Sequence, residues 1–299
     1  MNDDLFLHIL STLYIDRNKD GIKSDFGRTL LLGGSRQYPG AILIAASLAE
    51  VSGCGYIALS VPESIRNIVH ARMPLTFVTP DFEGQEDGFS LHQDPEKLLP
   101  YTAILFGNGI ADRKENESFL EDLLTFSHGF LVLDATALTL LARNPEVLKK
   151  KNAELKVLLT PHLGEASRLF KIDSRGKEPE CYLEECKAFS ERYDVAILLK
   201  SSRSLLVREG KVVLGDQIPT PSLGKAGSGD GLAGYLAGIL SYATKDFSFE
   251  EAVLFSDSMV HKAARREQEK LSAGIASILD VPQGIREIVM EVLAKRKEE

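Results

Sequence analysis

Short apolar runs alternate with helical patterns along most of the chain. The runs carry apolar side chains on both faces and end at polar or glycine residues, which is typical of central parallel strands. The predicted strands cover residues 29–34, 56–62, 102–109, 130–136, 155–161 and 195–201.

The segments between these runs have helical patterns, as in AILIAASLAEV at 41–51. Strands that alternate with helices imply right-handed crossovers and a layered α/β fold. Residues 204–215 differ, because two short runs meet at Glu209-Gly210 and predict a hairpin. The tail predicts two helices, over 249–271 and within the capped segment 273–299.

The chain contains no internal repeat and no low-complexity linker. Its most polar stretch, residues 81–97, is interpreted as a surface excursion rather than a domain boundary. We therefore expect residues 1–299 to form a single domain.

Composition narrows the class of protein. The chain is 44% hydrophobic and its net charge is -8, which disfavours general nucleic-acid binding. The start, MNDDLFLHIL, lacks the basic region of a signal peptide, and no apolar run is long enough to span a bilayer. Cys54, Cys181 and Cys186 form no CxxC pair, so neither zinc nor a disulfide framework is indicated. We expect a cytoplasmic protein with no membrane or nucleic-acid partner.

Polar or glycine residues follow several predicted strands, in the sequences GGS, GNG, DAT, TPH and KSS. Ligands in open α/β sheets bind beyond the carboxyl ends of the strands. The pattern therefore predicts a functional site at one edge of the sheet.

The glycine-rich segment GKAGSGDGLAG, residues 224–234, has the composition of a phosphate-binding loop. A Walker loop fails because Lys225 follows the first glycine, and the dinucleotide fingerprint at 229–234 lacks a preceding strand. A glycine loop that opens a helix remains, since free N–H groups there bind anions. Asp230 would then accept a proton from an attacking hydroxyl, or it would only cap the helix. The loop alone leaves both interpretations open.

Six motifs together resemble one family, the ADP/ATP-dependent NAD(P)H-hydrate dehydratases, the carbohydrate-kinase-like branch of the ribokinase superfamily. They are GGSRQYPGAILIAASLAEVSGCGYIALSVPE (33–63), GNGI (107–110), LVLDATAL (131–138), LLTPHLGEASRLF (158–170), LLKSSRSLLV (198–207) and GSGDGLAGYLAGIL (227–240). The resemblance covers roughly residues 15–290 and implies a ribokinase-like three-layer α/β/α sandwich with a mostly parallel central sheet.

The resemblance also implies a reaction, the repair of hydrated NADH or NADPH at the expense of ADP or ATP with Mg²⁺. The hydroxyl of the hydrate would be phosphorylated, and loss of phosphate would restore the double bond. The sequence does not distinguish ADP from ATP, or NADH hydrate from NADPH hydrate. A homo-oligomer is compatible with the family.

Roles follow from the resemblance, residue by residue. Asp230 matches the base, and Gly227, Ser228 and Gly229 match the anion hole. Substrate contacts are implied for Ala41, Gly109, His162 and Asp230. Nucleotide contacts are implied for Lys200, Ser201, Ser202, Arg203, Ser204 and Gly229, and Glu165 could organise Mg²⁺ through water.

Structural roles compete with several of these assignments. Ala41 could serve only close helix packing, and His162 could be a structural histidine. Glu165 would stabilise a helix dipole in any case, and Lys200 could be solvated. His261 matches a family histidine and is interpreted as a packing residue.

The chain departs from the family pattern at four places. Lys225-Ala226 replaces Thr-Gly, Thr136 replaces the second aspartate of Asp-Ala-Asp, and Asn108 and Ser201 replace a proline and a glycine. Ala226 would be strained if its φ were positive, and Lys225 could contact phosphate or solvent. These departures keep two alternatives open: a small-molecule kinase with Asp230 as base, and a nucleotide-binding homologue with impaired catalysis.

Overall fold

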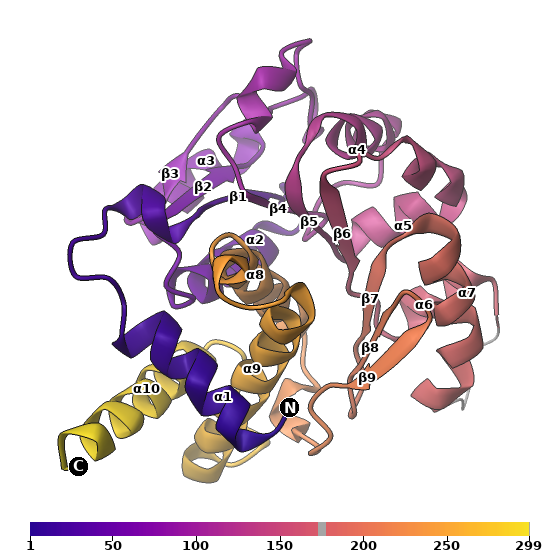
Figure 1. Ribbon diagram of the computed structural model, residues 1–299. Coiled ribbons are helices and arrows are strands. Elements are labelled where there is room, and N and C mark those ends of the chain that lie inside the picture. Colours follow the sequence, from indigo (N-terminus) through magenta and orange to yellow (C-terminus); the bar gives the residue numbers. More distant parts are fainter. Residues whose placement is uncertain (173–177, 299) are drawn as a thin grey trace.

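The computed structural model describes residues 1–172 and 178–298. A nine-stranded sheet in the order β3-β2-β1-β4-β5-β6-β7-β8-β9 forms its centre (Figure 1). Neighbouring strands from β3 to β7 pair in parallel, and β8 and β9 are antiparallel. The strands are β1 (Arg28–Leu32), β2 (Tyr56–Ser60), β3 (Phe77–Val78), β4 (Ala103–Phe106), β5 (Gly129–Leu133), β6 (Leu155–Leu159), β7 (Ala196–Leu199), β8 (Leu205–Arg208) and β9 (Lys211–Leu214).

The six predicted strands and the hairpin are therefore confirmed. The hairpin turns at Glu209 and Gly210, whose φ values of 50° and 70° match the left-handed turn that favours such connections. The sequence analysis missed β3, because a two-residue edge strand leaves no periodic pattern.

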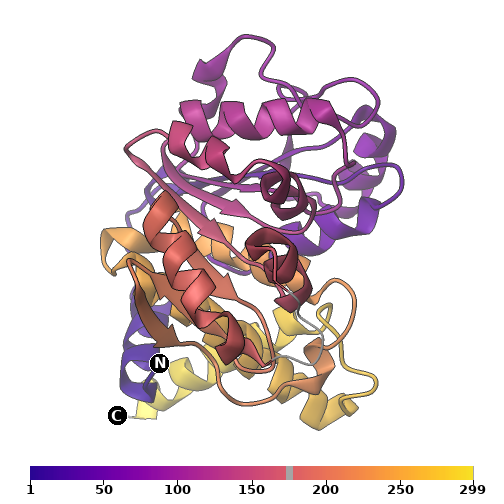
Figure 2. The same ribbon diagram turned by 90° about the vertical axis from the view of Figure 1, so that its right-hand side faces the viewer.

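Ten α-helices are present in the described residues, and they cover both faces of the sheet (Figures 1 and 2). They are α1 (Asp3–Leu10), α2 (Pro39–Glu50), α3 (Glu63–Arg72), α4 (Lys114–Phe126), α5 (Thr136–Arg143), α6 (Leu163–Phe170), α7 (Leu183–Tyr193), α8 (Ser228–Leu240), α9 (Phe249–Leu271) and α10 (Val281–Glu298). Short helical turns are η1 (Ser11–Ile15), η2 (Lys23–Phe26), η3 (Pro95–Leu98), η4 (Pro145–Lys150), η5 (Pro179–Tyr182), η6 (Pro221–Leu223) and η7 (Ala243–Lys245). Within the part of the chain that the structure describes, no helix is both long and apolar enough to cross a membrane.

Alternation along each strand divides the buried side chains between two cores. In β1, Leu31 joins the core under α2, α8 and α9, whereas Leu30 and Leu32 join the core under α4 to α7. In β5, Val132 joins the core under α2, α8 and α9, and Leu133 joins the core under α4 to α7. Because both faces are covered, each strand must be apolar throughout, which explains the runs in the sequence.

The polar stretch 81–97 contributes more to the core than a surface excursion would. Phe82 and Phe89 are fully buried, and their rings lie 6.3 and 5.8 Å from the ring of Phe119 on α4. The segment follows the edge strand β3, and its two aromatic residues are buried while its charged residues are partly or fully exposed.

Close packing of α2 against α8 fixes the start of α8 relative to the sheet. A Cβ at Gly234 would lie 2.0 Å from the carbonyl oxygen of Ala45 on α2, so the two helix backbones touch at this point. Only glycine permits this approach, since a backbone atom cannot yield as a side chain can.

We expect Gly234→Ala to lower the free energy of unfolding by about 3 kcal/mol, because the added methyl group must push the helices apart. Urea unfolding would measure the loss. The matched control is Gly40→Ala on the same helix pair, where a Cβ meets no atom within 4 Å. Equal midpoints for Gly234→Ala and the wild type would contradict the packing argument.

Candidate functional site

The glycine loop leads into α8 as expected, and the helix begins at Ser228, within the glycine-rich segment. Gly227, the N-cap, has a φ of 90°, which only glycine adopts readily. Ala226 is not among the described residues with positive φ, so the condition for strain at Ala226 is not met. The start of this 13-residue helix is the predicted anion site, because N–H groups in the first turn of a helix lack partners within the helix.

Lys225 makes two hydrogen bonds to the backbone. Its Nζ donates to the carbonyl oxygens of Gly274 and Ala276, at 2.8 and 2.6 Å. The lysine thus ties the glycine loop to the segment before α10 and does not simply point into solvent. It also lines the cavity next to the loop, and its contact with phosphate stays a prediction.

Asp230 lies in the first turn of α8 and does not cap it, since the N-cap is Gly227 and makes no side-chain cap bond. Oδ1 of Asp230 instead accepts a hydrogen bond from Nδ2 of Asn108 at 2.7 Å. Burial raises the pKa of Asp230, whereas the bond from Asn108 opposes that rise. A half-buried carboxylate with a raised pKa beside an anion site is suited to accept a proton.

Side chains that follow four adjacent strands meet at the carboxyl edge of the sheet. Asp134, after β5, is 1% exposed. Its Oδ1 accepts from Nζ of Lys200 at 2.6 Å and from the hydroxyl of Thr160 at 2.9 Å, and its Oδ2 accepts from Asn108 at 3.0 Å. Burial would raise the pKa of Asp134, but the charge and hydrogen bond of Lys200 together with the other donors hold it below its ordinary value.

The backbone next to this aspartate is strained. Ala135 has φ 49° and ψ -120°, an uncommon conformation for a residue with a side chain. Such strain is concentrated at functional sites, and here it accompanies the turn that presents Asp134 to its partners.

His162 and Glu165 form a reciprocal cap at the start of α6. Nδ1 of His162 accepts from the backbone N–H of Gly164 at 3.0 Å, and Oε2 of Glu165 accepts from the N–H of His162 at 2.9 Å. Burial raises the pKa of Glu165 to about 7 and lowers the pKa of His162, which Lys200 lowers further. Both residues therefore have structural roles, and both still lie beside Lys200, which pairs with His162 across a parallel β-bridge.

The raised pKa of Glu165 predicts a pH dependence of stability. The folded state binds an extra proton between pH 4.5 and about 7, so stability falls as pH rises through this window. We expect Glu165→Gln, which keeps an oxygen for the cap, to be up to about 3 kcal/mol more stable than the wild type at pH 8, and equal to it at pH 4. Urea unfolding without nucleotide would measure both values.

The control for this experiment is Glu154→Gln, a substitution at an exposed side chain, which should change stability at neither pH. Parallel pH profiles for Glu165→Gln and the wild type would show that Glu165 carries no buried charge at pH 8.

A cavity of about 440 Å³ opens next to the anion site. Its lining residues come from the segment after β7, from the loop before α8, from the first turn of α8 and from α9. They are His162, Lys200, Ser201, Ser202, Ser204, Pro219, Thr220, Pro221, Leu223, Gly224, Lys225, Ser228, Gly229, Leu232, Val260 and His261. The size suits a small organic ligand, and polar groups gather at one end.

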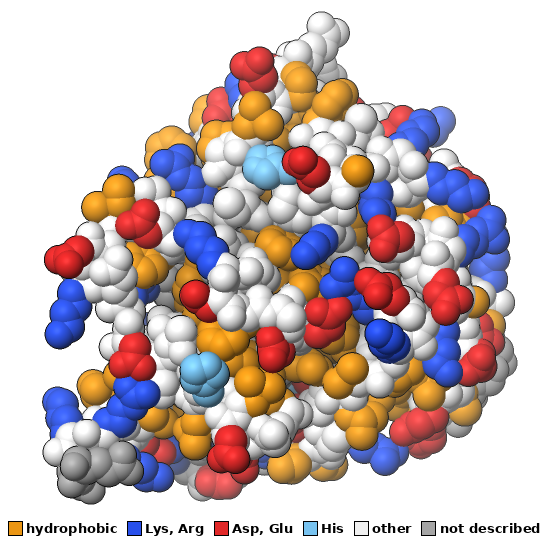
Figure 3. All heavy atoms as spheres, in the orientation of Figure 1, with side chains coloured by type: hydrophobic (Ala, Val, Ile, Leu, Met, Phe, Trp, Pro, Cys, Tyr) orange, Lys and Arg blue, Asp and Glu red, His pale blue; other side chains and the backbone are white. Residues whose placement is uncertain are grey.

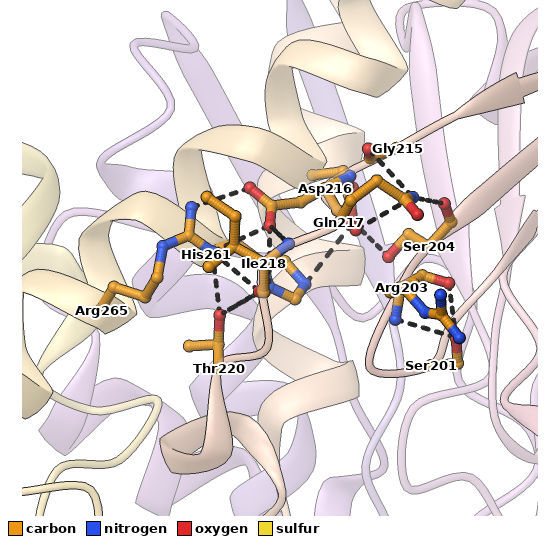
Figure 4. A network of polar contacts seen from close by, with 11 residues as sticks. Ser201, Arg203, Ser204, Gly215, Asp216, Gln217, Ile218, Thr220, His261 and Arg265 are labelled. Atoms are coloured by element: carbon orange, nitrogen blue, oxygen red, sulfur yellow. Dashed lines mark hydrogen bonds and ion pairs between the residues drawn. The ribbon is translucent and has the colours of Figure 1, made fainter.

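A network of polar contacts supports one wall of this cavity (Figure 4). Asp216 accepts from two guanidinium nitrogens of Arg265, both at 2.8 Å, and Thr220 bonds to Nδ1 of His261 at 3.0 Å. Asp257, on the same helix as His261, accepts from the hydroxyl of Ser204 at 2.9 Å. His261 is thus buried, as a packing residue would be, and it is also a member of the polar network that lines the cavity.

The cavity collects most of the residues predicted to bind nucleotide: Lys200, Ser201, Ser202, Ser204 and Gly229. Arg203 does not line it, since its guanidinium lies 3.9 Å from Glu178 and from Glu180 at the exposed surface. Sequence reasoning missed Thr220, because a loop threonine carries no pattern. The spacing of Asp257 and His261, one helical turn apart on a buried face, was an available signal.

The remaining predicted substrate positions, Ala41 and Gly109, lie next to each other. A Cβ at Gly109 would lie 2.8 Å from Cβ of Ala41, and Gly109 has a φ of 72°. A second hollow, of about 750 Å³, is lined nearby by Tyr38, Ile110 and Thr136 among others. Ala41 therefore packs closely, as its structural alternative predicted, although it is only partly buried.

In the view of Figure 3, positively and negatively charged side chains are interspersed over the surface, with apolar side chains between them.

Cys54, Cys181 and Cys186 are free thiols, as expected from their spacing. In residues 1–172 and 178–298, no group of three or more His, Cys, Asp or Glu side chains is placed to hold a metal ion.

The chain matches the Carb_kinase family, described as NAD(P)H-hydrate dehydratase, over residues 29–280. An ADP-dependent (S)-NAD(P)H-hydrate dehydratase of Lactiplantibacillus plantarum is 29% identical over 248 residues, which cover 82% of this chain and 82% of the relative. A bifunctional NAD(P)H-hydrate repair enzyme of Salinibacter ruber is 31% identical over 245 residues, 80% of this chain and 44% of the relative. The chain thus spans less than half the length of this bifunctional relative.

Among solved structures, the ADP/ATP-dependent NAD(P)H-hydrate dehydratase of Bacillus subtilis, co-crystallized with ATP/Mg²⁺, has a TM-score of 0.77. The two chains are 22% identical over 96% of this chain and 97% of that one, so this similarity concerns the fold. The sheet and its two helical layers are those of a ribokinase-like α/β protein, as the resemblance implied. With the match over residues 29–280, the chain belongs to the NAD(P)H-hydrate dehydratase family.

Proposed function

We propose that this protein dehydrates NAD(P)H hydrate in a reaction that consumes ADP or ATP. The observation that carries the proposal is the position of Asp230, a half-buried carboxylate in the first turn of α8, beside an anion site and a nucleotide-sized cavity. Family membership supports the same activity.

The geometry suggests a role for each side of the site. The nucleotide would occupy the cavity, with its sugar and base along Lys200 to Ser204 and its terminal phosphate at the N–H groups of Ser228 and Gly229. The hydrate would lie on the other side of Asp230, against Ala41 and Gly109, with His162 at the rim. Arg203 stays a predicted contact, which a rotation of its exposed side chain would have to provide.

The chemistry needs two steps. The hydroxyl oxygen of the hydrate attacks the terminal phosphorus, Asp230 accepts the hydroxyl proton, and the bond to the nucleotide breaks to leave AMP or ADP. The carbon–oxygen bond then breaks as phosphate leaves, and the neighbouring ring carbon gives up its proton to water as the double bond forms. Phosphate is a far better leaving group than hydroxide, which is why the nucleotide is needed. Burial raises the pKa of Asp230, which makes it a stronger base for the first step.

The side chains fit Mg²⁺ only as an ion carried by the nucleotide. Asp134 already accepts hydrogen bonds from Lys200, Thr160 and Asn108, and Asp230 is assigned as the base, so Glu165 is proposed to contact the ion through water. Bound there, Mg²⁺ would neutralise phosphate charge. Lys200 supplies a fixed positive charge from the protein at the same place.

The test is to incubate the protein with NADH hydrate or NADPH hydrate, with ADP, ATP or no nucleotide, and to follow the absorbance of the reduced nicotinamide ring. Recovery that requires a nucleotide supports the proposal, and the four combinations of a hydrate with ADP or ATP identify both substrates. No recovery with intact nucleotide binding would indicate an impaired homologue. Phosphate transfer to another small alcohol would indicate a kinase.

Three further expectations accompany this proposal. We propose that residues 1–299 act as one domain, which the single continuous sheet supports. A cytoplasmic location and a homo-oligomeric state stay predictions, and light scattering of the purified protein would measure the second.

A further inference from the structure

Asn108 occupies a constrained position at the end of β4. Its side chain is completely buried, and it lies between Gly107 and Gly109, which have φ values of 129° and 72°. A Cβ at Gly107 would lie 1.9 Å from the carbonyl oxygen of Asp134, so the backbone is pressed against the neighbouring strand. The amide of Asn108 therefore has little freedom to move.

The amide nitrogen of Asn108 joins two carboxylates. Nδ2 donates to Oδ1 of Asp230 at 2.7 Å and to Oδ2 of Asp134 at 3.0 Å. The chemistry of these partners fixes the orientation of the amide, because a flipped oxygen would face two acceptors. Both amide hydrogens are thus used between the two acids.

This arrangement leaves the amide oxygen of Asn108 without a hydrogen-bond donor in the part of the chain that the structure describes. Oδ1 of Asn108 is buried and has no hydrogen-bond partner among the described residues. A buried unpaired acceptor lowers stability, and such groups in native proteins call for a functional explanation.

The charges around Asp230 show what the amide contributes. Asp134 and Lys200 are the charged groups that act on the carboxylate of Asp230. Lys200 donates its short bond to Asp134, and no bond from Lys200 to Asp230 is present in the described structure. Without Asn108, two acids would face each other with no donor between them.

We propose that Asn108 is the positioning residue for the base: it holds Oδ1 of Asp230 and leaves Oδ2 free to accept the proton of the substrate hydroxyl. This inference rests on the proposed function. It extends the site to a residue that touches neither nucleotide nor hydrate and acts through Asp230.

The kinetic test compares Asn108→Asp with the wild type in the hydrate assay. The variant has the same shape without the amide donors. We expect kcat/KM at pH 7 to fall at least about tenfold, and the midpoint of its acid limb to move upward by about one pH unit, with the nucleotide Kd changed less than about threefold. A pH profile identical to that of the wild type would overturn the proposal.

The matched control is Asn116→Asp. Asn116 is also a fully buried asparagine, but its amide bonds to the backbone of Phe89 and Ala111 and lies outside the site. A loss of stability in Asn116→Asp without a shift of the pH profile would separate structural damage from loss of positioning. An equal shift in both variants would overturn the proposal.

A second measurement does not depend on turnover. Carbon-13 NMR of labelled aspartate carboxyl groups gives the titration midpoint of Asp230, with its signal assigned by its loss in Asp230→Asn. In Asn108→Ala, which removes the donors without adding a charge, we expect this midpoint to rise by about one pH unit. An unchanged midpoint would overturn the proposal. If the wild type fails to dehydrate the hydrate, the proposed function fails, while the NMR titration still decides the role of Asn108.

Discussion

Replacing Asp230 with asparagine is expected to lower the turnover of NAD(P)H hydrate by about 10³-fold. The amide keeps the size of the side chain and an oxygen that accepts the bond from Asn108, but it cannot take the hydroxyl proton. Loss of a positioned general base costs roughly 10²–10⁴ in rate. The assay is recovery of the reduced ring at pH 7 with saturating nucleotide.

Binding and stability controls make this result specific. Nucleotide Kd should change less than about threefold, and the exposed substitution Asp4→Asn should leave turnover unchanged. Stability should hold or rise at pH 7, because burial raises the pKa of Asp230 and disfavours its charged form. Turnover within about tenfold of the wild type would exclude Asp230 as the base.

Replacing Lys200 with methionine is expected to lower the free energy of unfolding by about 3–5 kcal/mol at pH 7. The substitution leaves Asp134, whose side chain is 2% exposed, without its positive partner. Thr160 and Asn108 still donate to the carboxylate, but neither neutralises its charge. Urea unfolding at pH 7 and at pH 4 would measure the loss.

The sign of the pH effect follows from Asp134. In the wild type its pKa is held below the ordinary value, so its contribution to stability is present above the unfolded pKa of about 3.8 and is lost below it. In Lys200→Met the unpaired acid protonates more easily, so the difference from the wild type should shrink at pH 4. The double variant Asp134→Asn with Lys200→Met should recover much of the loss. A single variant that loses less than about 1 kcal/mol would show that the ion pair is not needed for stability.

The two expectations differ in what they test. Asp230→Asn addresses the reaction and should leave the fold intact, whereas Lys200→Met addresses the charge balance that keeps the carboxyl edge of the sheet in place. Because Lys200 also lines the cavity, its variant should weaken nucleotide binding as well. Measuring both properties for both variants would show which side chains act on chemistry and which act on structure.

Much of this protein was determined by sequence alone. Runs such as LLLGG and FLVLD predicted buried strands, because a strand covered on both faces must be apolar throughout. The glycine-rich loop at 227–229 predicted a helix start that can bind an anion, since the required φ and the free N–H groups favour glycine there. The role of Asp230 as the base was implied by the family resemblance. Membership of the family followed from motifs that span most of the chain.

Only the tertiary structure decided how the polar residues are used. Nothing local to the sequence joins Asn108 to Asp230, 122 positions apart, or Asp134 to Lys200, 66 positions apart. Strand order brings them together, and strand order depends on which helices cover which face. The same reason explains Lys225, which binds carbonyl oxygens of residues 274 and 276, and His261, which lines a cavity built from distant loops. Sequence determines the conformation a residue can adopt, whereas packing determines the partner it meets.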